Sequence, residues 1–188
     1  MEKKVVLGAL LSFVVFLLCF RSAFFDVENE AQKRVIDSLF AFGGGKDLSK
    51  MGFSDVEVEH LVEVKKWVSV GRLFLLASLS VFCFGIAFVD VRKVFFYSGV
   101  FGLCVFVLLG ASLLLFDWSF VLMHKILFRT QWMFPEGSLL VKVFQYNFFV
   151  EKAKEIFFRF GLFVGLCFCS IFLLQRGFVA RRIENRRH

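Results

Sequence analysis

The sequence predicts an all-α polytopic membrane protein with four transmembrane helices, together with extracytoplasmic helices that are amphipathic or re-entrant. Apolar residues make up 59% of the 188 residues, whereas about 45–50% is usual in a soluble domain. The mean hydropathy is +0.75, and 30 phenylalanines are far more than one small core needs. Neither an internal repeat nor a low-complexity linker interrupts the chain, so we expect residues 1–188 to form a single membrane domain.

Four apolar runs are the predicted spans. The first run is short for a span, and a cleaved signal peptide is the alternative. Arg21 and Ser22 before Ala23 do not form a small-x-small cleavage site, so we expect an uncleaved transmembrane helix. The four predicted spans are residues 5–20, 73–89, 94–116 and 156–174.

The basic residues predict the topology. Residues 1–4, 90–93 and 175–188 hold nine of the 23 lysines and arginines. Positive charge in short segments beside spans marks the cytoplasmic side, so both termini are expected in the cytoplasm and segments 21–72 and 117–155 outside. The formal net charge of +7 therefore indicates contact with anionic membrane lipids, and no nucleic-acid partner is expected. The predicted location is the cell (cytoplasmic) membrane.

The first extracytoplasmic segment contains two predicted helices. Residues 29–41 carry apolar side chains on one face, which is typical of an amphipathic helix. Ser54 and Glu57 match a capping box, in which each side chain satisfies a free amide at a helix start. On that helix Glu57, His60 and Glu63 are spaced by three, so they project from roughly one side. His60 could be simply a solvated residue between two acids, which would raise its pKa.

The second extracytoplasmic segment begins with Asp117 and His124. Seven residues separate them, which places both on one helix face about two turns apart. An imidazole titrates near neutral pH and can act as a general base, and Asp117 could orient it. Alternatively, His124 packs at the membrane interface and Asp117 ends the third span.

Aromatic residues follow His124 closely. They are typical of an interfacial belt, and they could equally line a site for a lipid chain. Residues 134–137, Phe-Pro-Glu-Gly, predict a turn, and residues 139–149 form an apolar stretch too short to span, which could be re-entrant or interfacial. The residues expected in the belt are Trp118, Trp132, Tyr146, Phe148 and Phe149, and the four expected to line a lipid site are Phe128, Trp132, Phe134 and Phe148.

The predicted topology brings the two histidines together. His60 precedes the second span and His124 follows the third, and these spans are expected to be adjacent antiparallel helices. The two imidazoles should therefore converge near the outer headgroup region.

No metal or cofactor is predicted. The five cysteines all lie within apolar runs, where a disulfide framework is not expected, and no HExxH motif is present. Two alternatives to an enzyme remain at this point: a non-enzymatic membrane assembly or structural subunit, and a four-helix haem protein with His60 and His124 as axial ligands. The position of both histidines at span ends argues against the haem protein.

Two stretches resemble a known family. The first has Phe53-Ser54 followed by Glu57, His60 and Glu63-Val64-Lys65. The second has Asp117, Phe120, His124, Phe128, Trp132, Phe134-Pro135, Leu139-Leu140, Phe144 and Phe148-Phe149. With four spans and both histidines outside, this pattern is similar to the Lit family of lipoprotein intramolecular transacylases. Glu63 in place of an aspartate, and Gln145 in place of a proline, depart from the family pattern.

The resemblance implies an acyltransferase. Family members act on diacylated bacterial lipoproteins and move the sn-2 acyl chain of the diacylglyceryl-cysteine to its α-amino group, which gives a lyso-form lipoprotein. The family's catalytic candidates correspond to His60 and His124. Ester-to-amide transfer needs a base and an oxyanion stabiliser, so we assign the base to His124 and the second role to a protonated His60 held by Glu57 or Glu63, with Asp117 as a further supporting residue.

Overall fold

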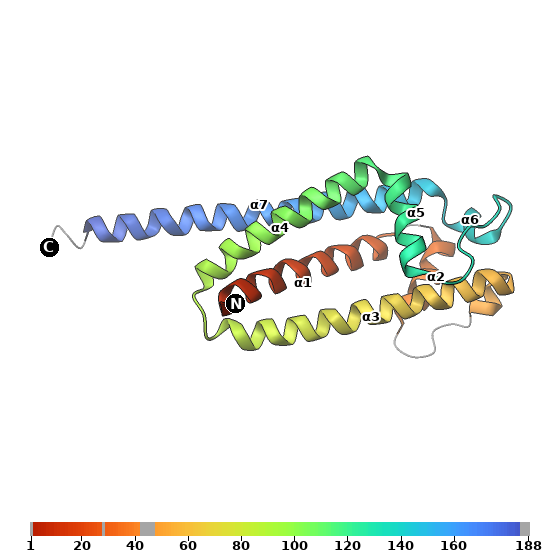
Figure 1. The fold of residues 1–188 in the computed structure, drawn as a ribbon, viewed down its shortest axis with the longest axis horizontal. Coiled ribbons are helices and arrows are strands. Elements are labelled where there is room, and N and C mark those ends of the chain that lie inside the picture. The colour runs from red at the N-terminus through yellow and green to blue at the C-terminus, as the bar shows by residue number, and fades with distance from the viewer. Residues whose placement is uncertain (1, 28, 42–47, 185–188) are drawn as a thin grey trace. The chain divides into compact units, whose positions relative to one another are not determined.

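The computed structural model describes residues 2–27, 29–41 and 48–184, and within these ranges the regular structure is entirely helical. Figure 1 shows the order of the helices along the chain. In order they are α1 (Lys3–Phe25), α2 (Glu30–Phe40), the 3-10 helix η1 (Leu48–Met51), α3 (Asp55–Ile86), α4 (Val91–Leu114), α5 (Phe116–Leu127), α6 (Leu139–Val143) and α7 (Tyr146–Glu184).

Three helices in the described part of the chain are long and apolar enough to cross a membrane. They are α1, α3 and α4. Helix α1 contains the predicted span 5–20, whereas α3 ends at Ile86 and α4 at Leu114, three and two residues before the predicted ends of spans 73–89 and 94–116. Helix α3 has 32 residues, so at 1.5 Å per residue it exceeds the roughly 30 Å hydrocarbon layer. Its first part, residues 55–72, lies outside the span predicted at 73–89 and carries the polar side chains considered below.

The fourth predicted span, residues 156–174, lies within α7 and is helical. It is not one of the three candidate spans found by length and composition. The number of four transmembrane helices therefore stays a prediction, whereas the all-α membrane fold is confirmed.

The chain divides into two compact units, each assembled from segments distant in sequence. Unit 1 comprises residues 1–19, 76–110 and 157–188, and unit 2 comprises residues 20–75 and 111–156. Within unit 2 lie all the residues that the sequence singled out for chemistry. The prediction of a single domain is not tested by this division.

Unit 1 has a close helix crossing at Ser12 of α1 and Ser98 of α4. The Ser12 hydroxyl donates to the Ser98 carbonyl at 2.7 Å, and the two hydroxyls lie 2.9 Å apart. Both serines are buried, and a Cβ added at Gly8 would lie 2.6 Å from the Cβ of Tyr97. Small residues thus allow the two helices to approach, as is common where membrane helices pack.

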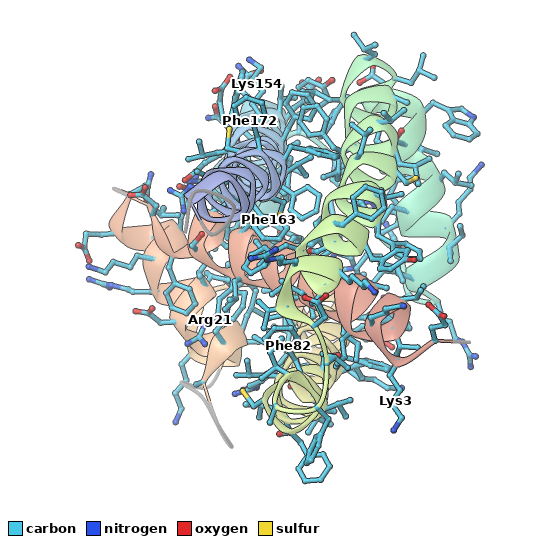
Figure 2. The ribbon with its side chains drawn as sticks, turned by 90° about the vertical axis from the view of Figure 1, so that its left-hand side faces the viewer. Lys3, Arg21, Phe82, Lys154, Phe163 and Phe172 are labelled. Carbon is cyan, nitrogen blue, oxygen red and sulfur yellow. The ribbon has the colours of Figure 1, made fainter. Side chains whose placement is uncertain are left out.

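Many large apolar side chains of the long helices face outward. Figure 2 shows phenylalanine side chains along them; of those labelled, Phe172 of α7 is exposed, whereas Phe82 of α3 and Phe163 of α7 are half-buried. Phe84 and Phe158 are more than two-thirds exposed. Such exposure would be unfavourable in water, so it agrees with lipid as the surrounding medium.

Unit 2 has an apolar core of its own outside the predicted spans. The predicted amphipathic helix 29–41 is confirmed as α2, which Asn29 caps by accepting from the amides of Ala31 and Gln32. The buried face of α2 packs with residues from η1, the start of α3, and α6. The fully buried members of this core are Val35, Leu39, Leu48, Phe53, Leu61 and Leu140.

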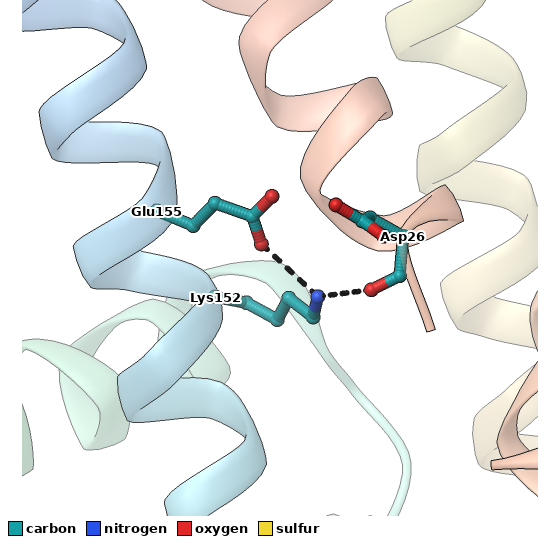
Figure 3. Close-up of polar contacts among 3 residues, drawn as sticks. All are labelled: Asp26, Lys152 and Glu155. Atoms are coloured by element: carbon teal, nitrogen blue, oxygen red, sulfur yellow. Dashed lines mark hydrogen bonds and ion pairs between the residues drawn. The ribbon is translucent and has the colours of Figure 1, made fainter. Parts of the chain in front are cut away.

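Lys152 joins the start of α7 to the end of α1. Its ammonium donates to the backbone carbonyl of Asp26 and pairs with the Glu155 carboxylate at 3.0 Å (Figure 3). One turn earlier on α7, Phe148 contacts Phe24 of α1 with 6.0 Å between ring centroids. The end of the first helix is therefore tied to α7 within unit 2 by both polar and aromatic contacts.

Candidate active site

The start of α3 is fixed by the predicted capping box. The Ser54 amide and hydroxyl both donate to Oε2 of Glu57 at 2.8 Å, and the Glu57 amide points back to the Ser54 hydroxyl at 3.4 Å. The side chain of Glu57 is only 4% exposed. His60 follows within the next turn, so its position is set by a helix start that is well defined.

Helix α5 places His124. A break at Leu115 separates α5 from α4, and α5 ends where the amide of Phe128 donates to the carbonyl of His124 at 2.9 Å. The indole Nε1 of Trp67 on α3 donates to the carbonyl of Leu127 at 2.8 Å. This bond joins the last turn of α5 to α3, the helix that carries His60.

The two histidines meet, which confirms their predicted convergence. Their ring centroids are 6.2 Å apart and their planes are 17° from parallel. His60 is 6% exposed and His124 is 8% exposed. Burial of both rings disfavours the charged imidazolium, so the pair is enclosed in an environment that favours neutral rings.

A backbone carbonyl fixes the tautomer of His124. Nδ1 of His124 lies 2.8 Å from the carbonyl oxygen of Phe120, one turn earlier on α5. Because a carbonyl only accepts, Nδ1 of the neutral ring carries the proton and Nε2 presents a lone pair. Burial lowers the pKa of His124, and the bond to Phe120 opposes this only in part. His124 is thus a neutral imidazole with a free basic nitrogen.

His60 differs from its predicted state. Burial, followed by the proximity of His124, lowers the pKa of His60 to about 4, and the smaller opposite effect of Glu63 does not compensate. The expectation of a raised pKa was wrong, because burial and the proximity of His124 outweigh the effect of Glu63. Nδ1 of His60 is buried and has no hydrogen-bond partner in the described structure, which is unusual for a buried polar atom.

Glu57 and Glu63 on α3 both bind backbone amides. Oε1 of Glu57 accepts from the amide of Leu140 at 2.7 Å, and Oε2 of Glu63 accepts from the hydroxyl of Thr130 at 2.7 Å. Burial acts to raise the pKa of Glu57, but the bonds from Leu140 and Ser54 outweigh it and leave the pKa below its ordinary value. For Glu63, the Thr130 hydroxyl, followed by the amide of Arg129, lowers the pKa. Both side chains are therefore carboxylates at neutral pH.

Asp117 does not orient His124 in this structure. The hydroxyl of Tyr146, at the start of α7, donates to the Asp117 carboxylate, and the Nδ1 atom of His124 is already bonded to Phe120. Two helical turns is too far for a direct contact when a nearer acceptor is present. The role that the sequence suggested for Asp117 is thus taken by a main-chain carbonyl, which no side-chain pattern can reveal.

Aromatic rings enclose the histidine pair. Phe128 lies 4.7 Å from His60 and 5.1 Å from His124, measured between centroids. Trp132 lies 5.0 Å from His124, and Phe134 lies 5.5 Å from His60. Three of the four predicted lining residues therefore contact the histidines.

Phe148 is the exception among the predicted lining residues. Its ring contacts Phe24, Phe144 and Phe149. Phe149 in turn packs on Phe120, which lies 4.1 Å from His124. Phe148 is thus part of the surrounding aromatic cluster, and Phe120 is a site residue that the sequence analysis used only as part of a motif.

The connecting segment after α5 has the predicted turn. The amide of Ser138 donates to the carbonyl of Pro135 at 2.9 Å, and Ser138 then caps α6 through Val141. The apolar stretch 139–149 is divided between α6 and the first turn of α7. In the described residues, no group of three or more His, Cys, Asp and Glu side chains is arranged to hold a metal ion.

Together these features define a helical membrane protein with two buried, neutral histidines enclosed by aromatic rings. The model of the family "Lipoprotein intramolecular transacylase Lit" matches residues 26–149, more than half of the chain, and the chain belongs to that family. No curated protein matches its sequence.

Solved structures show the same fold. The membrane-integral lipoprotein intramolecular transacylase Lit from Bacillus cereus aligns with a TM-score of 0.78 at 18% identity, covering 97% of this chain and 96% of that chain. A variant of that protein with one histidine replaced by arginine aligns with a TM-score of 0.77 at 17% identity, covering 95% and 93%. Family and fold together support a Lit-like function, a membrane location, and lipoproteins and lipids as partners in general.

Proposed function

We propose that this protein moves the sn-2 acyl chain of a diacylglyceryl-cysteine lipoprotein to the α-amino group of that cysteine. The observation that carries the proposal is the state of His124: a buried neutral imidazole whose Nδ1 proton is held by Phe120, which leaves Nε2 as a base. Transfer of an acyl group to a neutral amine requires such a base, because the attacking nitrogen becomes positively charged and must lose a proton before the amide can form.

The proton balance can be closed with His124 alone. The α-amino group enters the reaction as the neutral amine, its ammonium proton having been lost to water, and Nε2 of His124 takes one further proton as the amine nitrogen attacks the sn-2 ester carbonyl. The tetrahedral intermediate then breaks its bond to the glyceryl oxygen, and the imidazolium returns the proton to that oxygen. The products are an amide on the cysteine nitrogen and a free sn-2 hydroxyl, with no net gain or loss of protons.

His60 is assigned to the developing oxyanion. In its neutral form it can donate one N–H hydrogen bond, and the unpartnered Nδ1 is the buried ring nitrogen available for this. A neutral donor in a site with little water stabilises a negative oxygen well. This assignment replaces the protonated His60 expected from the sequence, since a pKa of about 4 leaves the ring uncharged at neutral pH.

The enclosure by aromatic rings favours transfer over hydrolysis. Phe128, Trp132 and Phe134 cover the imidazoles and limit the access of water, which protects a reactive intermediate. Because amine and ester belong to one substrate molecule, their effective concentration is high. A base and one hydrogen-bond donor can then suffice, without a covalent acyl-enzyme.

We place this site on the extracytoplasmic side, with both termini in the cytoplasm. The support is the charge distribution, since nine basic residues lie in the three short segments assigned to the cytoplasm. A lipoprotein with its diacylglyceryl group in the outer leaflet would present both ester and amine near that surface.

The direct test follows the acyl chain in a diacylglyceryl-cysteine peptide. Wild-type protein in detergent should convert it to an N-acyl, sn-2-lyso product of identical mass, so fragmentation by tandem mass spectrometry must locate the chain. His124→Ala should lose this conversion, whereas Lys125→Ala, at an exposed neighbouring position on α5, should retain it. An acyl chain that stays on the glyceryl oxygen with wild-type protein contradicts the proposal and favours a non-enzymatic assembly role.

The haem alternative gains no support from the geometry. Rings of Phe128, Trp132 and Phe134 pack against the two imidazoles at centroid distances of 4.7 to 5.5 Å. These side chains occupy the space that a porphyrin between the histidines would need.

A further inference from the structure

Glu57 anchors the far end of the segment that covers the histidines. Its Oε1 accepts from the amide of Leu140 at 2.7 Å, in a buried bond. Leu140 lies in the first turn of α6, where amides have no partner within the helix. The carboxylate of α3 thus satisfies a free amide of α6 and fixes where this short helix begins.

Glu63 anchors the near end of the same segment. Its carboxylate oxygens accept from the amide of Arg129 at 3.1 and 3.2 Å, from the amide of Thr130 at 3.2 Å, and from the Thr130 hydroxyl at 2.7 Å. Hydrogen bonds to an ionised acceptor are stronger than those between neutral groups. The carboxylate of Glu63 is therefore occupied by the chain that follows α5.

Glu57 and Glu63 flank His60 on α3, and the amides that they bind flank the rings that cover it. Glu57 and Glu63 stand one turn before and one turn after His60 on α3. Between the amides that they bind, the chain carries Trp132 and Phe134, and Phe128 lies immediately before the first anchored amide. Those three rings contact His124 and His60.

We propose that Glu57 and Glu63 are positioning residues that clamp residues 129–140 to α3 and thereby set the aromatic cover over the histidine pair. They act through main-chain amides and not as ion-pair partners of His60. The effect of the clamp on catalysis rests on the proposed function. The clamp itself can be tested without any measurement of activity.

The clamp makes a prediction that a charge effect does not. Thr130→Val removes one hydrogen bond to Glu63 and changes no charge, so it should mimic Glu63→Gln in direction. If Glu63 instead acts only by its charge, which raises the pKa of His60 slightly, Thr130→Val keeps that charge and should leave kcat unchanged.

Hydrogen exchange at single amides is the primary test. In Glu63→Gln the amides of Arg129 and Thr130 should exchange about tenfold faster than in wild type. The two charged carboxylate oxygens that accept from them are replaced by a single neutral amide oxygen. Glu59→Gln, at an exposed position on the same helix, is the matched control and should leave them unchanged. Unchanged exchange in Glu63→Gln would overturn the clamp and would not touch the acyl-transfer proposal.

Kinetics on the diacylglyceryl-cysteine peptide complete the test. Glu63→Gln and Thr130→Val should each lower kcat, by about tenfold and about threefold, whereas the control Glu59→Gln should keep the wild-type kcat. Both variants keep the buried Glu57 intact, so both should insert and fold. A lower kcat in Glu63→Gln with a wild-type kcat in Thr130→Val would refute positioning, whereas wild-type inactivity would refute the transacylase assignment and leave the exchange result standing.

Discussion

The rings of His60 and His124 lie nearly parallel with 6.2 Å between their centroids, although they belong to different helices. Two imidazoles this close cannot both be charged in a buried site without mutual repulsion. Proximity of His124 does lower the pKa of His60. The pair is therefore suited to unequal roles, in which His124 accepts a proton during the reaction and His60 stays neutral.

The role assigned to His60 predicts that a hydrogen-bond donor matters more than a charge. His60→Leu should reduce kcat by about 10²- to 10³-fold, the usual loss when an oxyanion donor is removed. His60→Gln keeps an N–H donor and should retain more activity than His60→Leu. Steady-state rates with the diacylglyceryl-cysteine peptide measure both variants.

Equal losses in the two His60 variants would argue against donation to an oxyanion. The position would then serve mainly for packing against Phe128 and Phe134. The control is the thermal midpoint of each variant in detergent. A lower rate with an unchanged midpoint would mean that the variant is folded and that the loss arises at the site.

The titration of the histidines is a second prediction. By NMR of the ring Cε1–H signals in detergent, both imidazoles should become protonated only below pH 6.5, and His60 near pH 4. His124→Gln removes the neighbouring imidazolium and should raise the pKa of His60. The new pKa should still lie below 6.5, because burial is the larger cause of the shift. A His60 pKa above 6.5 in wild-type protein would restore the protonated form expected from the sequence.

A third prediction concerns Asp117. Because its carboxylate binds the Tyr146 hydroxyl and not His124, Asp117→Asn should leave the rate within about threefold of wild type, since a lone exposed hydrogen bond contributes little. The asparagine amide oxygen can still accept from the Tyr146 hydroxyl, whereas Tyr146→Phe removes the bond outright, and it too should stay within about threefold of the wild-type rate. A loss of two orders of magnitude in Asp117→Asn alone would show that Asp117 acts on His124 in the reacting complex.

Patterns of residue type predicted much of the site. Apolar runs located three of the spans, the Ser54–Glu57 capping box fixed the start of α3, and the hairpin of two spans brought His60 to His124. Each of these depends on side-chain spacing or on chain connectivity, both of which can be read along the sequence.

The errors have two physical causes, and the first is hydrogen bonding by the backbone. The carbonyl of Phe120 holds His124, and the amides of Leu140 and Thr130 hold the acids that were expected to hold His60. Every residue other than proline has both an amide and a carbonyl, so no residue type marks those that bind a side chain. Burial had a similar effect, because the sequence showed two acids near His60 but not the rings that exclude water from it.

The fourth prediction tests the close crossing of α1 and α4 in unit 1. A Cβ at Gly8 would lie 2.6 Å from the Cβ of Tyr97, 2.8 Å from the amide nitrogen of Ser98 and 2.9 Å from the carbonyl oxygen of Val94. Two of these atoms belong to the backbone and cannot rotate away, so Gly8→Ala should destabilise the protein by about 1–3 kcal/mol through overpacking. Gly165→Ala is the matched control, because a methyl group at that position would have nothing within 4 Å and alanine favours the helix. Thermal unfolding in detergent should show a lower midpoint for Gly8→Ala and no decrease for Gly165→Ala; equal midpoints for the two variants would mean that α1 and α4 do not cross at Gly8.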